Sequence, residues 1–209
     1  MDKFNLKNLN TNRRWDYHTQ EYHSGNPITQ FLFNFFYKKL EEALMVLKSG
    51  DKILEVGCGA GESSLRIKRM LKDQYFEVSD IDEYYINKLK DKNFSLPVSQ
   101  ESVYDLKRGD NEFDCILFLE VLEHLKNPEC ALQELFRVSR KYVILSVPNE
   151  PLWRFLNLLR GKFITSLGNT PAHVNHWSVS EISDLVSRHG KIIKLYKPIP
   201  WIIIIAEKE

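Results

Sequence analysis

The chain has 209 residues, which is enough for one domain with a substantial hydrophobic core. Lysine plus arginine number 29 and aspartate plus glutamate 28, so a formal net charge of +1 gives no support for broad, non-specific nucleic-acid binding. The chain start lacks the apolar core of a signal peptide, and the strongest apolar run, residues 201–206, is too short to span a bilayer. Cys58, Cys115 and Cys130 all lie in predicted core elements, which favours a reduced chain. We therefore expect a cytoplasmic protein with no stable membrane insertion.

The first 49 residues are expected to form a helical cap. Asn26 and Pro27 are typical of a helix start, with asparagine as the N-cap and proline in the first turn. Apolar residues then recur at helical spacing from Ile28 to Leu47, and Gly50 is expected to end this helix. We interpret the phenylalanines of this stripe as core residues that pack against a sheet.

An apolar run followed by three closely spaced glycines is the central feature of the sequence. Residues 53–56 (Ile-Leu-Glu-Val) predict a buried strand, and a helix is expected to begin at Ser64. Between them lie Gly57, Gly59 and Gly61, where the missing Cβ lets the backbone approach a ligand. A strand, a glycine turn and a helix start in this order are typical of the entry to a nucleotide-binding crevice.

Strands and helices alternate along the rest of the chain. Further strands are expected at 75–80, 98–100, 114–119, 142–147, 191–196 and 201–207, and further helices at 83–90, 128–139 and 180–189. This order predicts an α/β fold with a doubly wound, Rossmann-like, mostly parallel sheet and a C-terminal antiparallel hairpin. We expect a single domain over residues 1–209. Within it, residues 50–149 form the cofactor-binding core, residues 150–177 a substrate-side insertion, and residues 178–209 the C-terminal helix and strands.

Two classes of cofactor suit a glycine turn of this kind. A dinucleotide site requires a third glycine or alanine where this chain has Glu62, and a carboxylate there would repel a diphosphate at the helix N-terminus. A ligand with an adenosine and a cationic centre but no phosphate is compatible with Glu55 and Glu62. Asp80 follows the second strand at close to the ~20-residue spacing at which an acid meets ribose hydroxyls. These residues favour S-adenosylmethionine as the cofactor.

Five motifs in the right order resemble those of the class I S-adenosylmethionine-dependent methyltransferases. They are Leu-Glu-Val-Gly-Cys-Gly-Ala-Gly at 54–61, Val-Ser-Asp-Ile-Asp at 78–82, Asn-Glu-Phe-Asp-Cys-Ile at 111–116, Glu-Val-Leu-Glu-His-Leu at 120–125 and Ser-Val-Pro-Asn at 146–149. The resemblance covers about residues 50–190. It implies cofactor contacts at Glu55, Gly57, Cys58, Gly59, Gly61, Asp80, Ile81, Ser102, Val103 and Glu120. Ser102 stands where many relatives have an acid that faces the adenine amine.

His124 is the candidate catalytic residue. Methyl transfer from a sulfonium mainly requires alignment of nucleophile, methyl and sulfur in a dry pocket, and a hydroxyl nucleophile also gains from a base. His124 follows the fourth strand, where the family usually positions its substrate. The alternative is a structural imidazole that bonds to a backbone carbonyl.

The same region carries residues that suit a divalent metal ion. Glu120, Glu123 and His124 would share one side of a helix that begins near Glu120, and His173 and His176 could approach from the insertion. This set resembles metal-assisted methyltransferases that act on catechol-type quinone precursors or on ribose 2′-hydroxyls at small-RNA ends. Because many relatives with Glu-x-x-Glu-His carry no metal, we do not favour a metal from the sequence.

The expected substrate is a small molecule that is methylated at oxygen. A metal-assisted RNA 2′-O-methyltransferase and a non-catalytic cofactor-binding protein stay open as alternatives, although the balanced charge does not favour a nucleic-acid partner. The apolar stretch 151–163 is interpreted as a substrate lid or a packed helix, with membrane-surface contact as a further alternative.

Overall fold

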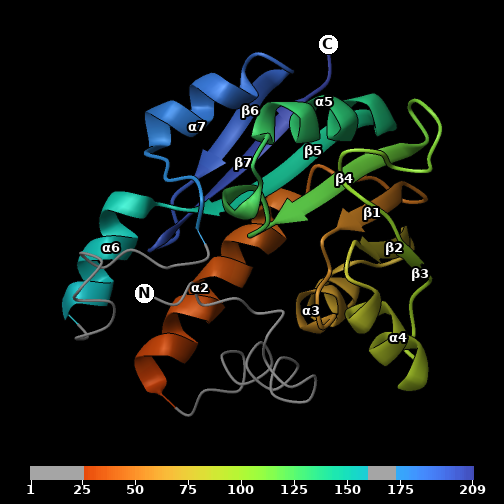
Figure 1. Ribbon diagram of the computed structural model, residues 1–209, viewed down its shortest axis with the longest axis horizontal. Coiled ribbons are helices and arrows are strands. Elements are labelled where there is room, and N and C mark those ends of the chain that lie inside the picture. The colour runs from red at the N-terminus through yellow and green to blue at the C-terminus, as the bar shows by residue number, and fades with distance from the viewer. Residues whose placement is uncertain (1–25, 160–172) are drawn as a thin grey trace.

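The computed structural model describes residues 26–159 and 173–209 (Figure 1). The strands are β1 (Lys52–Val56), β2 (Tyr75–Asp80), β3 (Val98–Gln100), β4 (Phe113–Leu119), β5 (Ser139–Pro148), β6 (Lys191–Tyr196) and β7 (Trp201–Glu207). The helices are α2 (Pro27–Leu44), α3 (Glu62–Met70), α4 (Glu83–Asp91), α5 (Pro128–Val138), α6 (Glu150–Leu159) and α7 (Val179–Val186), with a 3-10 turn η2 (Leu122–His124). Parts of the predicted cap (1–25) and of the predicted insertion (160–172) lie outside the described residues.

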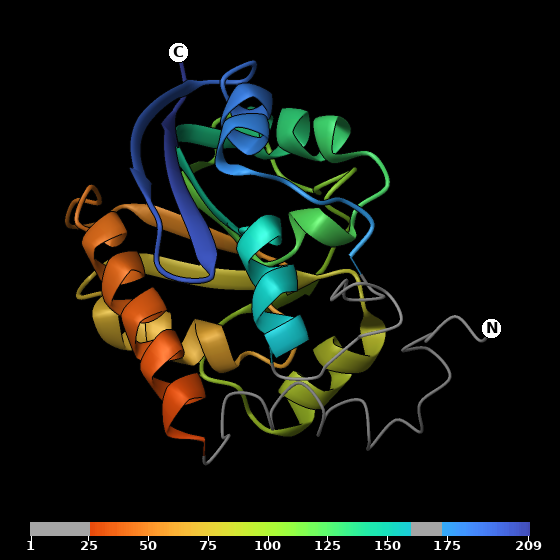
Figure 2. The ribbon, with the colours of Figure 1, turned by 90° about the vertical axis from the view of Figure 1, so that its left-hand side faces the viewer.

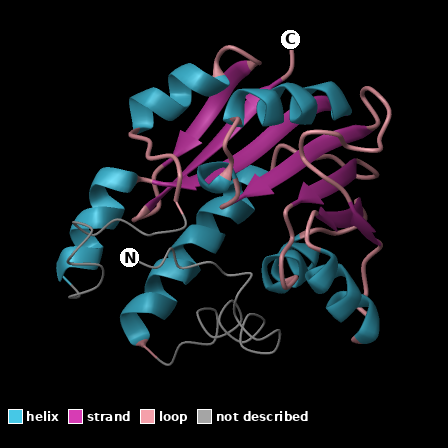
Figure 3. Cartoon of the chain, in the orientation of Figure 1, coloured by secondary structure: helices cyan, strands magenta, loops and turns pink. Residues whose placement is uncertain are grey.

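The strands of the described residues form one sheet (Figure 3), in the order β3-β2-β1-β4-β5-β7-β6 (Figure 1). β1 pairs in parallel with β2 and β4, while β7 pairs antiparallel with both β5 and β6. The predicted α/β class, the mostly parallel sheet and the C-terminal antiparallel hairpin are thereby confirmed. The carboxyl ends of the parallel strands meet at one edge, where ligands bind in open α/β sheets.

Helices cover both faces of the sheet (Figure 2). The helices α2, α3 and α4 pack on one face, and α5 and α7 pack on the other. The core between the sheet and α2, α3 and α4 includes Leu40, Ile53, Ile67, Leu89, Leu117 and Ile205. The core between the sheet and α5 and α7 includes Leu54, Ile116, Leu132, Leu145, Ile182 and Ile204. Burial of these side chains is the main stabilising contribution and holds the strand ends that carry the site in place.

Helix α2 begins where the sequence predicts and ends earlier. Asn26 Oδ1 accepts a hydrogen bond of 2.9 Å from the backbone N–H of Ile28, as expected of an N-cap. The helix ends at Leu44, so the prediction that Gly50 ends it is wrong. Leu44 is the last buried residue of the helix, and Gly50, at φ +76°, belongs to the turn that leads into β1. The aromatic stripe is core only in its second half, since Phe31 is 68% exposed.

One of the three cysteines does not lie in the core. Cys58 and Cys115 are buried as predicted, whereas Cys130 is exposed, so its assignment to the core is wrong. Cys130 lies in the first turn of α5, and the buried side of that helix begins at the next residue, Ala131. No helix within residues 26–159 and 173–209 is long and apolar enough to cross a membrane.

Candidate active site

The glycine loop after β1 is held against the end of β2. The backbone N–H groups of Gly57 and Cys58 both donate to the carbonyl oxygen of Ser79, at 2.7 and 3.0 Å. Gly57 adopts φ +85°, and a Cβ built on it would lie 2.5 Å from a methyl carbon of Val121. Both constraints require glycine, because an L side chain rarely adopts this backbone conformation and would collide with Val121. Gly61, at φ +78°, forms the turn into α3.

Asp80 and Gly59 are joined directly. The backbone N–H of Gly59 donates to Asp80 Oδ2 at 2.8 Å, and the backbone N–H of Asp82 donates to Oδ1 at 2.8 Å. A Cβ on Gly59 would meet no heavy atom within 4 Å, so the loop borders open space there. Ile81, the next residue, is 65% exposed. The structure thus brings the predicted ribose-binding acid to the rim of an open region beside the glycine loop.

Glu55 lies in β1 beneath the loop and is almost completely buried. Its Oε1 accepts a hydrogen bond of 3.0 Å from Ser63 Oγ, while its Oε2 has no hydrogen-bond partner among the described residues. Burial raises the pKa of Glu55 to about 7, because the charged form loses its hydration. A buried acceptor without a donor fits a ligand that carries an ammonium group.

The segment after β3 is organised around an arginine that the sequence analysis did not select. Arg108 Nη2 lies 2.7 Å from Oε1 of the buried Glu101, and Arg108 Nη1 lies 2.8 Å from Glu77 Oε1. Ser102 Oγ accepts a hydrogen bond from the backbone N–H two residues further on, and the Val103 side chain is buried. Glu101, the acid next to Ser102, is thus engaged by Arg108.

Glu120 follows β4 in a left-handed conformation, with φ +57°. Its backbone N–H donates to the carbonyl oxygen of Ser146, and Ser146 Oγ donates to Glu120 Oε1 at 2.7 Å. Loss of hydration raises the pKa of Glu120 to about 7. The expected helix from Glu120 is wrong, because a residue at positive φ cannot continue a right-handed helix and η2 begins at Leu122.

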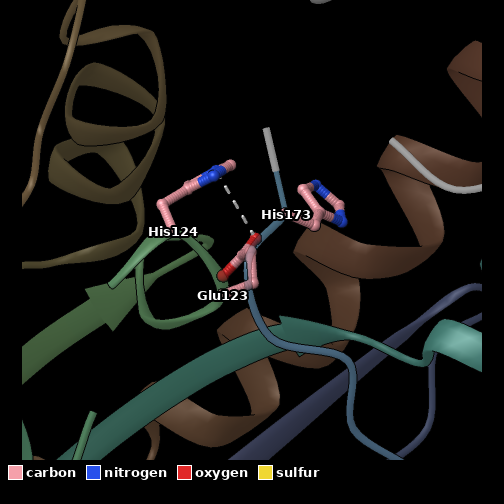
Figure 4. Close-up of side chains that lie close together, drawn as sticks. All are labelled: Glu123, His124 and His173. Atoms are coloured by element: carbon pink, nitrogen blue, oxygen red, sulfur yellow. Dashed lines mark ion pairs between the residues drawn. The ribbon is translucent and has the colours of Figure 1, made fainter. Parts of the chain in front are cut away.

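Three side chains from two distant segments converge near the end of β4 (Figure 4). Glu123 is buried, and His124 Nε2 lies 3.9 Å from Glu123 Oε1 with the imidazole 42% exposed. The His173 ring lies edge-to-face against His124, with ring centroids 5.2 Å apart. One possible ligand atom from each of the three residues lies within 4.8 Å of the others. Burial, and then the charge of Glu120, raises the pKa of Glu123 well above its usual range.

Glu150 is a functional candidate that the sequence analysis missed. This buried acid opens α6, and its Oε1 lies 2.5 Å from His173 Nδ1 while its Oε2 lies 3.4 Å from His176 Nδ1. Of the five predicted metal ligands, only Glu123, His124 and His173 form the close cluster; Glu120 and His176 lie outside it. An acid two residues after the last parallel strand, at the carboxyl edge of the sheet, was the available signal for Glu150.

The comparisons with known proteins agree with this geometry. Residues 28–191 match a family model described as a methyltransferase domain. The 27-O-demethylrifamycin SV methyltransferase of Amycolatopsis mediterranei is 26% identical over 46% of this chain and 38% of its own length. The ubiquinone/menaquinone biosynthesis C-methyltransferase UbiE of Nitrosospira multiformis is 22% identical over 73% of this chain and 67% of its own length. The crystal structure of magnesium protoporphyrin IX methyltransferase from Synechocystis PCC 6803 with bound SAH matches with a TM-score of 0.72 at 16% identity, over 95% of this chain and 96% of that chain.

The chain therefore belongs to the methyltransferase domain family, of the class I S-adenosylmethionine-dependent type. It spans between about two fifths and two thirds of the length of the curated relatives that it matches. S-adenosylmethionine is the cofactor of this class. The residues present fit it, because Glu55 offers an acceptor without a donor, Gly59 borders open space and Asp80 lies at the loop.

Proposed function

We propose that the protein transfers the methyl group of S-adenosylmethionine to a hydroxyl oxygen of a small molecule. The observation that carries the proposal is the exposed imidazole of His124 beside the buried carboxyl group of Glu123, with 3.9 Å between Nε2 and Oε1. His124 follows Val121, whose side chain packs against the glycine loop at Gly57. A proton acceptor thus lies in the turn after β4, the strand that pairs with β1, and β1 leads into the cofactor loop. The relatives include a protein named 27-O-demethylrifamycin SV methyltransferase and one named as a C-methyltransferase, so the choice of oxygen rests on His124.

The chain's residues divide the work of binding and proton transfer. The glycine loop, Glu55 and Asp80 would hold the cofactor, which would supply an activated methyl group. His124 accepts the proton of the acceptor hydroxyl as a general base, and the neighbouring Glu123, when ionised, stabilises the imidazolium that results. Trp153 of α6 packs against the rings of His173 and Trp201, with centroids 6.2 and 5.9 Å away, and forms an aromatic wall beside the cluster.

A second candidate mechanism has a divalent cation beside the acceptor hydroxyl. Three acids gather at this edge, namely Glu120, Glu123 and Glu150, and no lysine or arginine of the described residues forms an ion pair with any of them. Glu123 Oε2 is buried without a hydrogen-bond partner among the described residues. A cation held by Glu123, His124 and His173 would favour the ionised form of Glu123 and the deprotonated hydroxyl.

A turnover assay with variants tests the proposal. Formation of S-adenosylhomocysteine is followed with the low-molecular-weight fraction of a cell extract as the source of acceptors. We expect turnover with wild type and a loss of about 100-fold in His124→Gln, the scale of general-base catalysis. His189→Gln is the matched control, because His189 stacks on Phe136 within the α5 side of the core. Turnover confined to the RNA fraction and abolished by RNase would contradict a small-molecule acceptor.

The same turnover assay, repeated after removal of metal ions with EDTA, distinguishes the general-base mechanism from the cation mechanism. Turnover that persists after exhaustive EDTA treatment supports His124 as the base. Turnover that is lost with EDTA and restored by Mn²⁺ supports the cation.

A further inference from the structure

The carboxyl group of Glu150 is buried and ties two parts of the site together. It is 2% exposed, and Oε1 lies 2.5 Å from His173 Nδ1. The backbone N–H of Glu150 also donates to the carbonyl oxygen of Trp177 at 3.2 Å. Only Asn149 separates Glu150 from β5, so these contacts dock residues 173–177 onto the carboxyl edge of the sheet.

This contact selects the tautomer of His173. When the carboxyl group of Glu150 accepts the 2.5 Å hydrogen bond, the His173 proton lies on Nδ1. Nε2 then carries a lone pair. Neutral imidazole has one donor and one acceptor nitrogen, and the partner of one nitrogen decides the role of the other.

The free nitrogen belongs to the cluster with Glu123 and His124. One ligand atom from each of these three residues lies within 4.8 Å of the others. Because Nδ1 of His173 is engaged by Glu150, Nε2 is the nitrogen available to that cluster. Metal-binding histidines are commonly held in this way, with the second ring nitrogen donating to a carboxylate.

We propose that Glu150 is a positioning residue that holds His173 as the Nδ1–H tautomer, so that Nε2 completes a divalent-cation site with Glu123 and His124. The inference rests on the cation mechanism of the proposed function. One carboxylate and two imidazoles are a donor set that suits Mn²⁺, Fe²⁺, Co²⁺ or Zn²⁺ better than Mg²⁺ or Ca²⁺. Three protein ligands also leave coordination positions open for an acceptor oxygen.

Cobalt titration of the full chain tests the site without a known acceptor. Co²⁺ is added to wild type, Glu150→Met, Glu150→Gln and His176→Gln, and its visible absorption bands report the ligand set. We expect wild type to bind Co²⁺, Glu150→Met to bind about 10- to 100-fold more weakly, and Glu150→Gln, whose amide oxygen can still accept from Nδ1, to lie between them. His176→Gln is the matched control, because His176 contacts the same carboxyl group but lies outside the cluster. It should bind within about threefold of wild type, since the three ligands are untouched.

The tautomer is measured separately by ¹⁵N NMR of histidine-labelled, metal-free protein. We expect the proton of His173 on Nδ1 in wild type and on Nε2 in Glu150→Met. Equal Co²⁺ affinity in wild type and Glu150→Met, or an unchanged tautomer, would overturn the role of Glu150. Absence of Co²⁺ binding to wild type would overturn the divalent-cation site of Glu123, His124 and His173. The proposed methyl transfer would still stand if metal-free protein formed S-adenosylhomocysteine.

Discussion

The backbone N–H of Gly59 donates a hydrogen bond of 2.8 Å to Asp80 Oδ2, which joins the loop after β1 to the acid at the end of β2. The same carboxyl group accepts from the backbone N–H of Asp82. Asp80 therefore both shapes the loop and lies where ribose hydroxyls are expected. Substitution of Asp80 should therefore weaken cofactor binding more than it lowers the stability of the fold.

Substitution of Asp80 should weaken cofactor binding. We expect Asp80→Ala to raise the dissociation constant of S-adenosylmethionine about tenfold or more, the scale of a lost hydrogen bond to a charged group. Asp80→Asn keeps one acceptor oxygen and should therefore lose less affinity for S-adenosylmethionine than Asp80→Ala. Calorimetric titration measures both. Glu83→Ala removes an exposed carboxylate nearby and should bind like wild type; equal affinity in Asp80→Ala would contradict the role of Asp80.

Two glycines of the loop offer a matched pair of alanine substitutions. A Cβ on Gly57 would lie 2.5 Å from Val121 Cγ2, whereas a Cβ on Gly59 would meet nothing within 4 Å, and both residues have positive φ. Gly57→Ala therefore adds a steric clash to the backbone strain that both variants share. We expect Gly57→Ala to lower the free energy of unfolding by about 1–3 kcal/mol more than Gly59→Ala.

Chemical denaturation measures the difference between these glycine variants. Val121→Ala should restore part of the loss in Gly57→Ala, because it removes the colliding methyl groups. Equal free energies of unfolding for Gly57→Ala and Gly59→Ala would contradict a close contact between Val121 and Gly57.

Burial of Glu55 predicts a pH dependence of stability. Its pKa is raised from 4.5 to about 7, so between these values the folded state holds a proton that the unfolded state has lost. The contribution of Glu55 to stability is therefore present below about pH 4.5 and is lost as the pH rises through about 7. We expect Glu55→Gln, measured without cofactor, to gain about 2 kcal/mol over wild type between about pH 5 and pH 8. A difference that does not change with pH would contradict the burial of an ionisable group there.

The network around Arg108 should be important for stability and for the segment that carries Ser102. Arg108→Met leaves Glu77 and the buried Glu101 without their partner, and loss of one member of such a network costs about 2–4 kcal/mol. Thermal and urea unfolding measure the loss. Lys107→Met is the control, because Lys107 and its partner Asp105 are both exposed and such pairs contribute little. Similar stabilities of the two variants would contradict a structural role for the network.

The sheet and the glycine loop could be predicted because their signals are local. Apolar runs between turns mark buried strands, and only glycine suits the backbone at position 57. Gly50 and Cys130 were misjudged because the end of a helix and its buried side depend on packing against distant residues. Glu150 and Arg108 escaped detection for a related reason. Glu150 contacts His173, 23 residues further along the chain, and Arg108 contacts Glu77, 31 residues before it.

The metal ligand set was only partly predictable from spacing. Glu120, Glu123 and His124 have helical spacing, but Glu120 takes φ +57° and bonds to Ser146 instead. The local backbone conformation therefore separated one carboxylate from the other two residues. The approach of His173 depends on residues 173–177, which are placed by contacts with Glu123 and Glu150.

The most direct measurement follows a ¹³C label from the methyl group of S-adenosylmethionine into the low-molecular-weight fraction of a cell extract. Wild-type protein is predicted to move the label into a product whose methyl carbon has the NMR shift of an O-methyl group, and His124→Gln is predicted to form little of it. A label found on carbon or nitrogen would contradict transfer to oxygen. A label that stays on S-adenosylmethionine with every acceptor fraction would contradict methyl transfer itself.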